Sequence, residues 1–265
     1  MNWLESALMG YLASYLWPFI RISSMIGAMY IIGSSVMPVR VRLVLAVVLS
    51  WAITPLIPVI NPGVELMSIE GFLVTINQVI IGSVMGFTTE LLSQCFIMAG
   101  QVIAMQTGLG FASVMDPVNG SSTPVVGQFF SMACALVFFG IDGHLVFIEL
   151  LYRSFTTVPV GLDFLPPDSY HHIFSFLSVM FQTAVNFSIA SICTMLIINI
   201  TFGILTRAAP QLNIFSMGFA VSLILGVGVL WMAMGDFMSF FSYQFDQTTD
   251  LICRVFGDNC VGGLR

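Results

Sequence analysis

The sequence contains no lysine, and charged residues of any kind are scarce. Only 8% of its 265 residues are charged, whereas about a quarter are charged in a soluble globular domain. Seven arginines stand against thirteen carboxylates, which gives a formal net charge of -6. This composition argues against a soluble fold. It lacks the basic surface that nucleic-acid binding requires, and the absence of lysine excludes a lysine-containing phosphate loop.

Long uncharged runs are present instead, and 58% of the residues are hydrophobic. Because a helix needs about 20 apolar residues to cross a bilayer, the sequence predicts an all-α, multi-helix membrane protein. The N-terminus carries Glu5 and no Lys or Arg before the first apolar run. It therefore lacks the positive region of a cleavable signal peptide, and we expect the first helix to be retained. The runs cover 22–39, 43–64, 71–89, 91–115, 117–141, 208–235 and, with neutral histidines, 169–206.

Breaks in the apolar pattern predict six long helices in one membrane domain. The first is expected from about residue 11 to Pro38, because proline lacks an amide donor and restricts the residue before it. A short turn over residues 38–42 then holds Arg40 and Arg42. The second helix begins near Leu43 and ends in the proline-rich residues 54–63. The other four are expected at about 71–105, 124–152, 173–205 and 212–243.

The arginines predict an orientation, because cytoplasmic loops are enriched in Lys and Arg. Arg40 and Arg42 fall in the first connection and Arg207 in the fifth, whereas the second and fourth connections carry carboxylates. We therefore expect the odd connections in the cytoplasm and both termini outside. Three arginines oppose this assignment, namely Arg153, Arg254 and Arg265, and the carboxylates are Glu65, Glu70, Asp163 and Asp168.

The five cysteines fall into two groups. Cys95, Cys134 and Cys193 lie in expected helices, where cysteine usually behaves as a small apolar side chain. Cys253 and Cys260 lie in the C-terminal tail, which the expected orientation places in an oxidising compartment. A disulfide between these two is a hypothesis.

Five charged residues cannot easily reach water from a long apolar helix: Arg21, Glu90, Asp142, Glu149 and Asp236. Charges inside a membrane are functional candidates by default. Structural pairing or a water-lined interior is the alternative interpretation. The spacing does not offer the matched carboxylates and basic partners of a proton relay.

No motif predicts enzymatic or metal chemistry. His171 and His172 point about 100° apart on a helix and make a poor chelate. The seventeen methionines, several within 232–238, suggest copper transport, but most are scattered singly and fill gaps in apolar packing. The sequence has no Gly-x-Ser-x-Gly elbow. We expect no enzyme activity, no metal and no cofactor.

Gly82 and Gly86 have the spacing of a helix-packing motif, because small residues let two backbones approach closely. An ordinary packing face within the chain is one interpretation. A face for a partner subunit is the other.

The stretch 106–130 is too apolar for an ordinary loop. Between Gly71 and Glu149 there are 79 residues, and two ordinary spanning helices use about 40 to 50 of them. Nearly all of the remaining residues are uncharged, and Asp116 is the only charge of the stretch. The segment is therefore expected to be enclosed.

The backbone of this stretch is not predicted to be continuous helix. Gly108 and Gly110 loosen the chain, and the sequence DPVNG at 116–120 is a strong turn signal. Thr123 is placed to cap the next helix, and Pro124 suits its first position. Irregular backbone at membrane depth must be surrounded by protein or by a water-filled cavity, which predicts a re-entrant or pore-occluding loop. Its candidate residues are Gly108, Leu109, Gly110, Phe111, Ala112, Ser113, Val114, Met115, Asp116, Pro117, Asn119 and Gly120.

Asp116 has two interpretations. Its carboxylate closes a turn over the following amides, or it makes an ion-sensing or gate-holding contact in a pore. Replacement by Asn preserves the turn and distinguishes the two.

Three blocks of the sequence, at 108–130, 141–161 and 207–219, resemble the FliR family of bacterial flagellar export-gate proteins. The blocks occur in order over most of the chain, and the helix count and chain length also match. Related subunits of virulence type III secretion systems share the Asp-Pro and Pro-Gln blocks. Ala220 departs from the flagellar branch, where a proline commonly follows Gly-Phe. The matching residues are Phe111, Ala112, Asp116, Pro117, Asp142, Gly143, His144, Ser154, Phe155, Pro159, Gly161, Pro210, Gln211, Asn213 and Phe215.

This resemblance implies a subunit of a flagellar type III protein export gate in the bacterial inner membrane, within the basal body. Such proteins assemble with FliP and FliQ into the entry channel for unfolded flagellar proteins. Residues 1–160 resemble a FliP-like part whose loop, 106–124, plugs the channel, residues 170–245 resemble a FliQ-like hairpin, and 246–265 form a tail. A turn near FlhB and FlhA faces the cytoplasm through Arg207, Pro210, Gln211 and Asn213.

The resemblance also implies that the export ATPase and the proton motive force supply the energy, so this subunit would be conduit and barrier. The alternative from another class is a stand-alone transporter or channel for small solutes. Purification distinguishes them, because a gate subunit requires its companions and a transporter does not.

Overall fold

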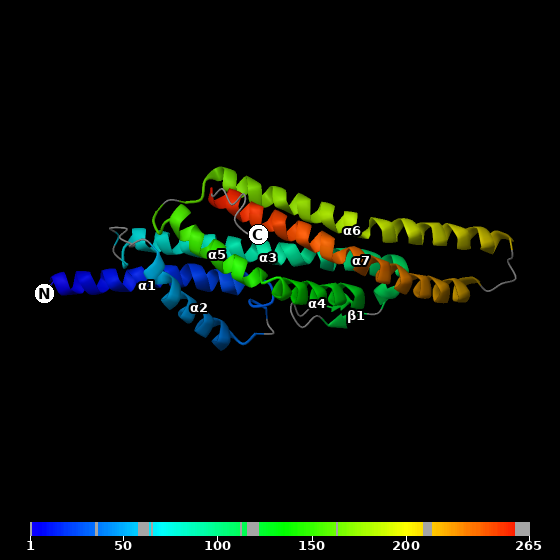
Figure 1. The fold of residues 1–265 in the computed structure, drawn as a ribbon, viewed down its shortest axis with the longest axis horizontal. Coiled ribbons are helices and arrows are strands. Elements are labelled where there is room, and N and C mark those ends of the chain that lie inside the picture. Colours follow the sequence, from blue (N-terminus) through cyan, green and yellow to red (C-terminus); the bar gives the residue numbers. More distant parts are fainter. Residues whose placement is uncertain are drawn as a thin grey trace. The chain divides into compact units, whose positions relative to one another are not determined.

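The computed structural model of the protein describes residues 2–34, 37–57, 64, 66–111, 113–115, 122–162, 164–208 and 214–257. These residues form seven α-helices, two short 3-10 helices and one pair of short strands (Figure 1). The α-helices are α1 (Asn2–Ala28), α2 (Val39–Ile53), α3 (Ile69–Thr107), α4 (Val125–Gly140), α5 (Gly143–Thr157), α6 (Pro167–Ala208) and α7 (Ile214–Phe256). The 3-10 helices are η1 (Thr54–Leu56) and η2 (Leu109–Phe111), and the strands are β1 (Ser113–Met115) and β2 (Ser122–Pro124).

The helices have the length and composition of membrane spans. Among the described residues, four helical segments are long and apolar enough to cross a membrane. A fifth span is added if α4 and α5, which are bent by 66° relative to each other, are counted as one broken span. The predicted all-α membrane class is confirmed.

The fourth predicted helix, expected at about 124–152, is interrupted. α4 ends at Gly140, and Asp142 adopts a left-handed conformation with φ of 56° before α5 begins. The Leu145 N–H then donates to the Asp142 carbonyl at 2.9 Å. The prediction of one continuous helix is wrong, because the glycines at 140 and 143 flank a residue whose short polar side chain tolerates positive φ. Apolar periodicity alone carries no signal of such a break.

The first helix lies about nine residues closer to the N-terminus than predicted, from Asn2 to Ala28. α1 ends at Ala28 rather than near residue 37, and the chain turns through Ile31, whose φ is 68°. The Tyr30 N–H donates to the Thr89 hydroxyl of α3 at 2.9 Å. A contact between helices therefore satisfies a backbone donor that follows the end of α1, and Pro38 does not set that end.

The two arginines predicted in a turn lie in the first turn of α2 instead. α2 begins at Val39, directly after Pro38. Arg42 turns back and donates to the carbonyls of Gly33 (2.8 Å) and Met37 (3.2 Å). The prediction of a turn over 38–42 is wrong because a proline at the start of a helix removes only an amide that would have no helical partner.

The described chain packs as two compact units. The first comprises 1–91, 139–176 and 247–265, and the second comprises 92–138 and 177–246. α3, α6 and α7 each contribute to both units.

In the first unit, α1 packs closely on α3. A Cβ atom on Gly82 would collide with the Arg21 carbonyl, and one on Gly86 would lie 2.7 Å from the Ala28 Cβ. Trp17 and Ile22 of α1 are fully buried. Gly82 and Gly86 therefore form a packing face within the chain, which was one of the two interpretations of their spacing.

Phenylalanines form the core of the second unit. The Phe96 ring of α3 lies 5.7 Å from Phe187 of α6, 5.1 Å from Phe237 and 5.8 Å from Phe241 of α7. Phe130 of α4 approaches Phe187 within 5.3 Å. Offset and edge-to-face aromatic pairs add to the free energy of apolar burial, so this cluster fixes the four helix segments of the unit.

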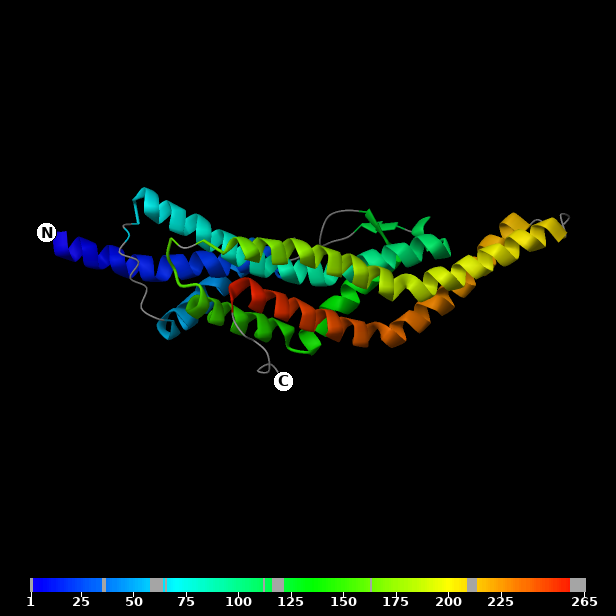
Figure 2. The ribbon, with the colours of Figure 1, turned by 90° about the horizontal axis from the view of Figure 1, so that it is seen from above.

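α6 and α7 form an antiparallel helical pair. Within the second unit their yellow and orange segments run side by side (Figures 1 and 2). The Thr183 hydroxyl donates to Gln244 Oε1 at 2.8 Å across the pair, and the Phe187 and Phe240 rings are 5.4 Å apart. The described parts of residues 170–245 thus include a helical hairpin.

The expected division of the cysteines holds only in part, because the sixth helix, expected to end near residue 243, continues to Phe256 as α7 and includes Cys253. Cys95 and Cys134 are buried and free, and Cys193 is exposed and free. Cys253 is buried and disulfide-bonded. Its expected partner, Cys260, lies outside the described residues, so the pairing stays a prediction.

Candidate functional site

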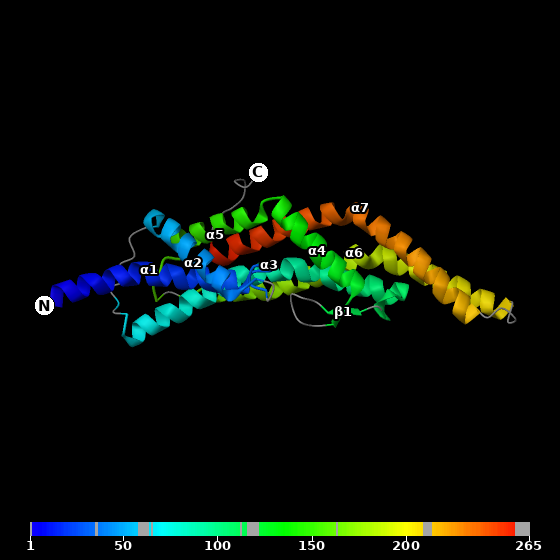
Figure 3. The same ribbon diagram turned by 90° about the horizontal axis from the view of Figure 1, so that it is seen from below.

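The loop between α3 and α4 is built as a short β-hairpin. α3 ends at Thr107, and Gly108 takes a left-handed conformation with φ of 81°, which is the usual way for glycine to end a helix. The chain continues through η2 into β1, and β1 pairs antiparallel with β2 (Figure 3). In this register residue 113 pairs with 124, 114 with 123, and 115 with 122.

The hairpin includes part of the predicted plug residues. Gly108, Leu109, Gly110 and Phe111 follow α3 or form η2, and Ser113, Val114 and Met115 form β1. Thr123 and Pro124 lie in β2, so α4 begins at Val125, one residue later than the predicted start. Ala112 lies outside the described residues, and so does the expected turn with Asp116, Pro117, Asn119 and Gly120.

Two glycines bring the stems of the hairpin together. A Cβ atom on Gly100 of α3 would lie 2.8 Å from Phe130 Cδ2 and 3.0 Å from the Gly127 Cα of α4. A Cβ atom on Gly127 would meet Gln101 Cγ at 3.3 Å. Both contacts are too close for any larger side chain without movement, so the hairpin projects from a tightly packed helix pair.

α7 supports the end of α3 directly below the hairpin. A Cβ atom on Gly226 would lie 2.6 Å from the Thr107 Cβ. Thr107 is fully buried, and its hydroxyl donates to the carbonyls of Ile103 (3.0 Å) and Ala104 (3.2 Å). The last turn of α3 is therefore fixed by its own backbone and by contact with α7.

A buried arginine organises the first unit. Arg21 is fully buried, and its Nε donates to Gln78 Oε1 at 2.7 Å. Its Nη1 donates to the carbonyl and hydroxyl of Ser154 at 2.9 and 3.2 Å, and its Nη2 donates to the Val158 carbonyl at 3.0 Å. The guanidinium also lies 4.3 Å from the centre of the Phe155 ring. No carboxylate pairs with Arg21 among the described residues.

These contacts place Arg21 at the C-terminal end of α5. The last carbonyls of a helix lack partners within it and carry partial negative charge, so a guanidinium is well matched to them. A second contact follows two residues after Pro159, where the Gly161 carbonyl accepts from Asn77 Nδ2 at 3.3 Å. Residues from Ser154 to Gly161 include the Ser-Phe and Pro-x-Gly motifs noted in the sequence. These contacts hold that block against α1 and α3.

The other intramembrane candidates are placed differently. Glu149 forms an exposed pair with Arg153 at 2.8 Å, Asp142 forms the left-handed turn before α5, and Glu90 is half-buried. Asp236 lines a groove in the second unit. Structural pairing thus accounts for Arg21 and Glu149 and does not account for Asp236.

The second predicted site is described only at its start. Arg207 lies in the last turn of α6 and is exposed, a position that suits a cation because the C-terminal end of a helix is partly negative. Pro210, Gln211 and Asn213 lie outside the described residues.

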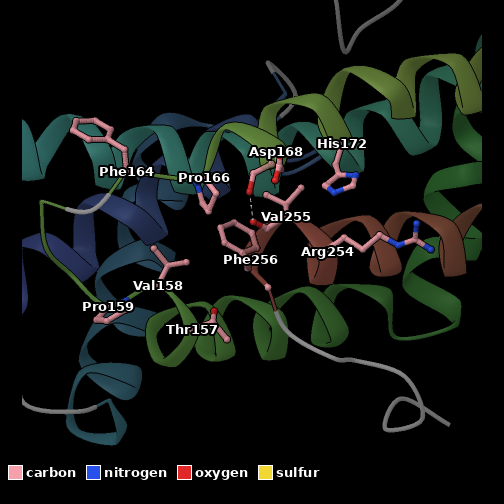
Figure 4. Close-up of a pocket in the computed structure, with 12 residues that line it drawn as sticks. Thr157, Val158, Pro159, Phe164, Pro166, Asp168, His172, Arg254, Val255 and Phe256 are labelled. Carbon is pink, nitrogen blue, oxygen red and sulfur yellow. Dashed lines mark hydrogen bonds between the residues drawn. The ribbon is translucent and has the colours of Figure 1, made fainter.

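A pocket of about 390 Å³ lies in the first unit among the ends of α5 and α7 and the start of α6 (Figure 4). The Ser169 hydroxyl donates to the Val255 carbonyl at 2.7 Å and ties α6 to α7 there. Asp168, His172 and Arg254 give the pocket a mixed lining. Among the described residues no group of three or more His, Cys, Asp or Glu side chains is placed to hold a metal ion.

Two of these features escaped sequence reasoning. Arg21 was visible as a lone charge in an apolar helix, but its partners lie 57 to 137 residues away. The sequence does not distinguish Gly226 from Gly228 and Gly235. A Cβ atom added at either of those two glycines would meet no atom within 4 Å.

Comparisons with known proteins cover nearly the whole chain. The model of the family described as bacterial export proteins, family 1, matches residues 12–248. Flagellar biosynthetic protein FliR of Escherichia coli (strain K12) is 29% identical over 250 residues, which cover 94% of this chain and 95% of that protein. FliR of Pectobacterium carotovorum subsp. carotovorum is 28% identical over 248 residues, covering 94% of each chain. FliR of Caulobacter vibrioides is 26% identical over 253 residues, covering 95% and 99%.

Proposed function

The chain belongs to the bacterial export proteins, family 1, and from this membership we propose that it is a non-enzymatic subunit of a flagellar type III protein export gate. Its relatives carry the name flagellar biosynthetic protein, which supports a role in flagellum biogenesis. In this proposal the chain joins FliP and FliQ to form the entry channel for unfolded flagellar proteins.

The observation that carries the proposal is the hairpin between α3 and α4. A channel wide enough for a polypeptide leaks ions unless an apolar constriction excludes water. Residues 108–120 supply one charge, Asp116, among apolar and small residues. The hairpin projects from the Gly100–Gly127 contact and lies beside the Thr107–Gly226 contact. We propose that these contacts hold the plug in place.

Exposed apolar helix faces support assembly with other subunits. Ile204 of α6 is 66% exposed and Trp231 of α7 is 79% exposed, and lipid or protein must cover such faces. We propose that residues 1–160 act as a FliP-like part and 170–245 as a FliQ-like part of the assembly. The turn that includes Arg207, Pro210, Gln211 and Asn213 then faces FlhB and FlhA.

The proposed location is the inner membrane of a bacterium, within the flagellar basal body and with both termini periplasmic. The disulfide bond of Cys253 near the end of α7 supports an oxidising environment for the C-terminus. Arg207 at the opposite end of the α6–α7 hairpin supports a cytoplasmic turn.

Co-purification tests this proposal against a stand-alone transporter. The full chain is expressed with FliP and FliQ of the same organism and, separately, alone, and size-exclusion chromatography follows membrane extraction. We expect one large complex with the companions and a heterogeneous chain without them. A homogeneous chain that moves a small solute after reconstitution by itself would contradict the proposal.

The plug is tested by deletion of residues 110–121. These residues lie beyond the Gly100–Gly127 contact, so the shortened chain is expected to enter the complex with normal yield. Ion flux through vesicles that contain the complex should rise, because the apolar barrier is removed. The matched control replaces the same residues by an uncharged apolar segment of equal length. If vesicles with the deletion variant leak no more ions than vesicles with the control variant, the plug is excluded.

A further inference from the structure

A groove with a mixed polar and apolar lining lies on the α6–α7 hairpin. It has a volume of about 300 Å³ and lies within the second unit. Asp236 of α7 and Asn186 of α6 are exposed on it, and neither side chain makes a hydrogen bond or ion pair with another described residue. The lining residues are Asn186, Phe187, Ala190, Ser191, Thr194, Val229, Met232, Ala233, Asp236 and Phe240.

The rim of the groove is apolar. Met232, which lines the groove, is 69% exposed, and the α7 segment from Ala220 onward is apolar enough to span a membrane. An exposed carboxylate in such a segment is unfavourable unless water or a partner solvates it. The groove therefore combines an apolar contact area with the Asp236 carboxylate, which needs solvation or a partner.

The second unit cannot neutralise Asp236 itself. Its residues, 92–138 and 177–246, contain one basic side chain, Arg207. The groove residues of α6 end at Thr194, so Arg207 lies thirteen residues further along α6, which is about 20 Å of helix. Within its own unit, Asp236 therefore has no complementary charge nearby.

We propose that this groove is the docking site for one transmembrane helix of a companion gate subunit, FliP or FliQ, that places a lysine or arginine against Asp236. The proposal rests on the proposed function, because it requires an assembled gate. An apolar rim around a polar centre suits helix association in a membrane, where interhelical polar contacts add to van der Waals packing. A basic side chain also satisfies the carboxylate, which an apolar helix or lipid does not.

The experiment uses the full chain expressed with FliP and FliQ. A photo-crosslinking amino acid replaces Met232, and mass spectrometry identifies the crosslinked peptide. The same probe at Leu196, which is exposed on α6 outside the groove, is the positional control. We expect crosslinks from position 232 to a FliP or FliQ peptide that contains a lysine or arginine.

A second arm measures the contribution of the charge. Asp236→Asn keeps the size of the side chain and is expected to lower recovery of that companion by roughly fivefold to thirtyfold, the range expected for one interhelical polar contact. Asp250→Asn is the matched control, because Asp250 lies on the same helix in an exposed pair with Arg254 and such pairs contribute little. A double variant that places a basic residue at position 236 and a carboxylate at the crosslinked basic position should restore recovery of the companion.

The outcomes separate this inference from the proposed function. If the wild-type chain recovers no companion, the proposed function fails. If companions are recovered but position 232 crosslinks a second copy of this chain or nothing, or if Asp236→Asn changes nothing, the docking inference is overturned and the proposed function stands. Altered ion flux with unchanged recovery also overturns it, because Asp236 would then act as an ion site.

Discussion

Arg21 is a cation whose partners are all neutral among the described residues. Its guanidinium donates to Gln78, Ser154 and Val158 and lies over Phe155. Arginine suits this position because its planar fork donates in several directions at once, whereas lysine is a compact point charge. Burial of such a charge is costly, and hydrogen bonds to its N–H groups are needed to offset that cost.

Replacement of Arg21 by Met is therefore expected to destabilise the chain by about 3 kcal/mol or more, because buried acceptors lose their donor. Arg21→Lys should recover only part of the loss, since lysine cannot reproduce the fork. The measurement is the thermal unfolding midpoint of the assembled complex in detergent.

Arg153→Met is the control for this comparison. Arg153 is exposed and pairs with Glu149 four residues earlier, an arrangement worth about 0.3 to 0.5 kcal/mol. Equal midpoints for Arg21→Met and Arg153→Met would show that Arg21 does not hold α5.

Close helix contacts determine where the hairpin between α3 and α4 is held. Gly100 and Gly127 bring its two stems together, and Gly226 lets α7 approach Thr107 at the end of α3. Because interiors are densely packed, a side chain added at such a contact forces the helices apart. The pairing of β1 with β2 then extends from a fixed base.

Gly226→Val is expected to destabilise the complex by about 1 to 3 kcal/mol through overpacking against Thr107. Gly228→Val is the matched control, because a Cβ atom there meets nothing within 4 Å. Unfolding midpoints of the two variants give the comparison.

A double variant tests whether the collision is with Thr107. Combined with Thr107→Gly, Gly226→Val should lose less stability than the two single changes sum to, since neighbouring sites couple. Strict additivity would mean that Gly226 acts elsewhere on α7.

The longest helices exceed the thickness of a membrane. α3 has 39 residues, α6 has 42 and α7 has 43, so each is about 60 Å long at 1.5 Å per residue. The hydrocarbon core of a bilayer is about 30 Å thick. Part of each helix must therefore lie outside the hydrocarbon or be covered by other subunits.

Thiol labelling tests the proposed orientation of α6. Single cysteines replace Phe174 and Ile204, which are 68% and 66% exposed, in a chain whose free cysteines Cys95, Cys134 and Cys193 are changed to Ala. A membrane-impermeant maleimide should label position 174 in intact spheroplasts and position 204 only after permeabilisation. The reverse pattern would place the termini in the cytoplasm.

Much of the architecture follows from linear features of the chain. The low content of charged residues and the length of the apolar runs predicted the membrane class. Residue counting placed an interrupted segment between α3 and α4, where the hairpin lies. The ends of α1 and α4 were wrong, because Tyr30 bonds to Thr89 and Asp142 enters the left-handed region. Neither event leaves a trace in hydrophobic periodicity.

Composition, spacing and motif order in the sequence were sufficient for the helical membrane class, the family and the place of the hairpin. Tertiary structure alone shows that Arg21 caps α5, that Gly226 and not Gly228 is a contact, and that Asp236 lies on a groove with no partner in the described part of the chain. The physical reason is that helices apolar on nearly every face do not specify their rotation in sequence. Only packing against neighbours selects which side of each helix is buried.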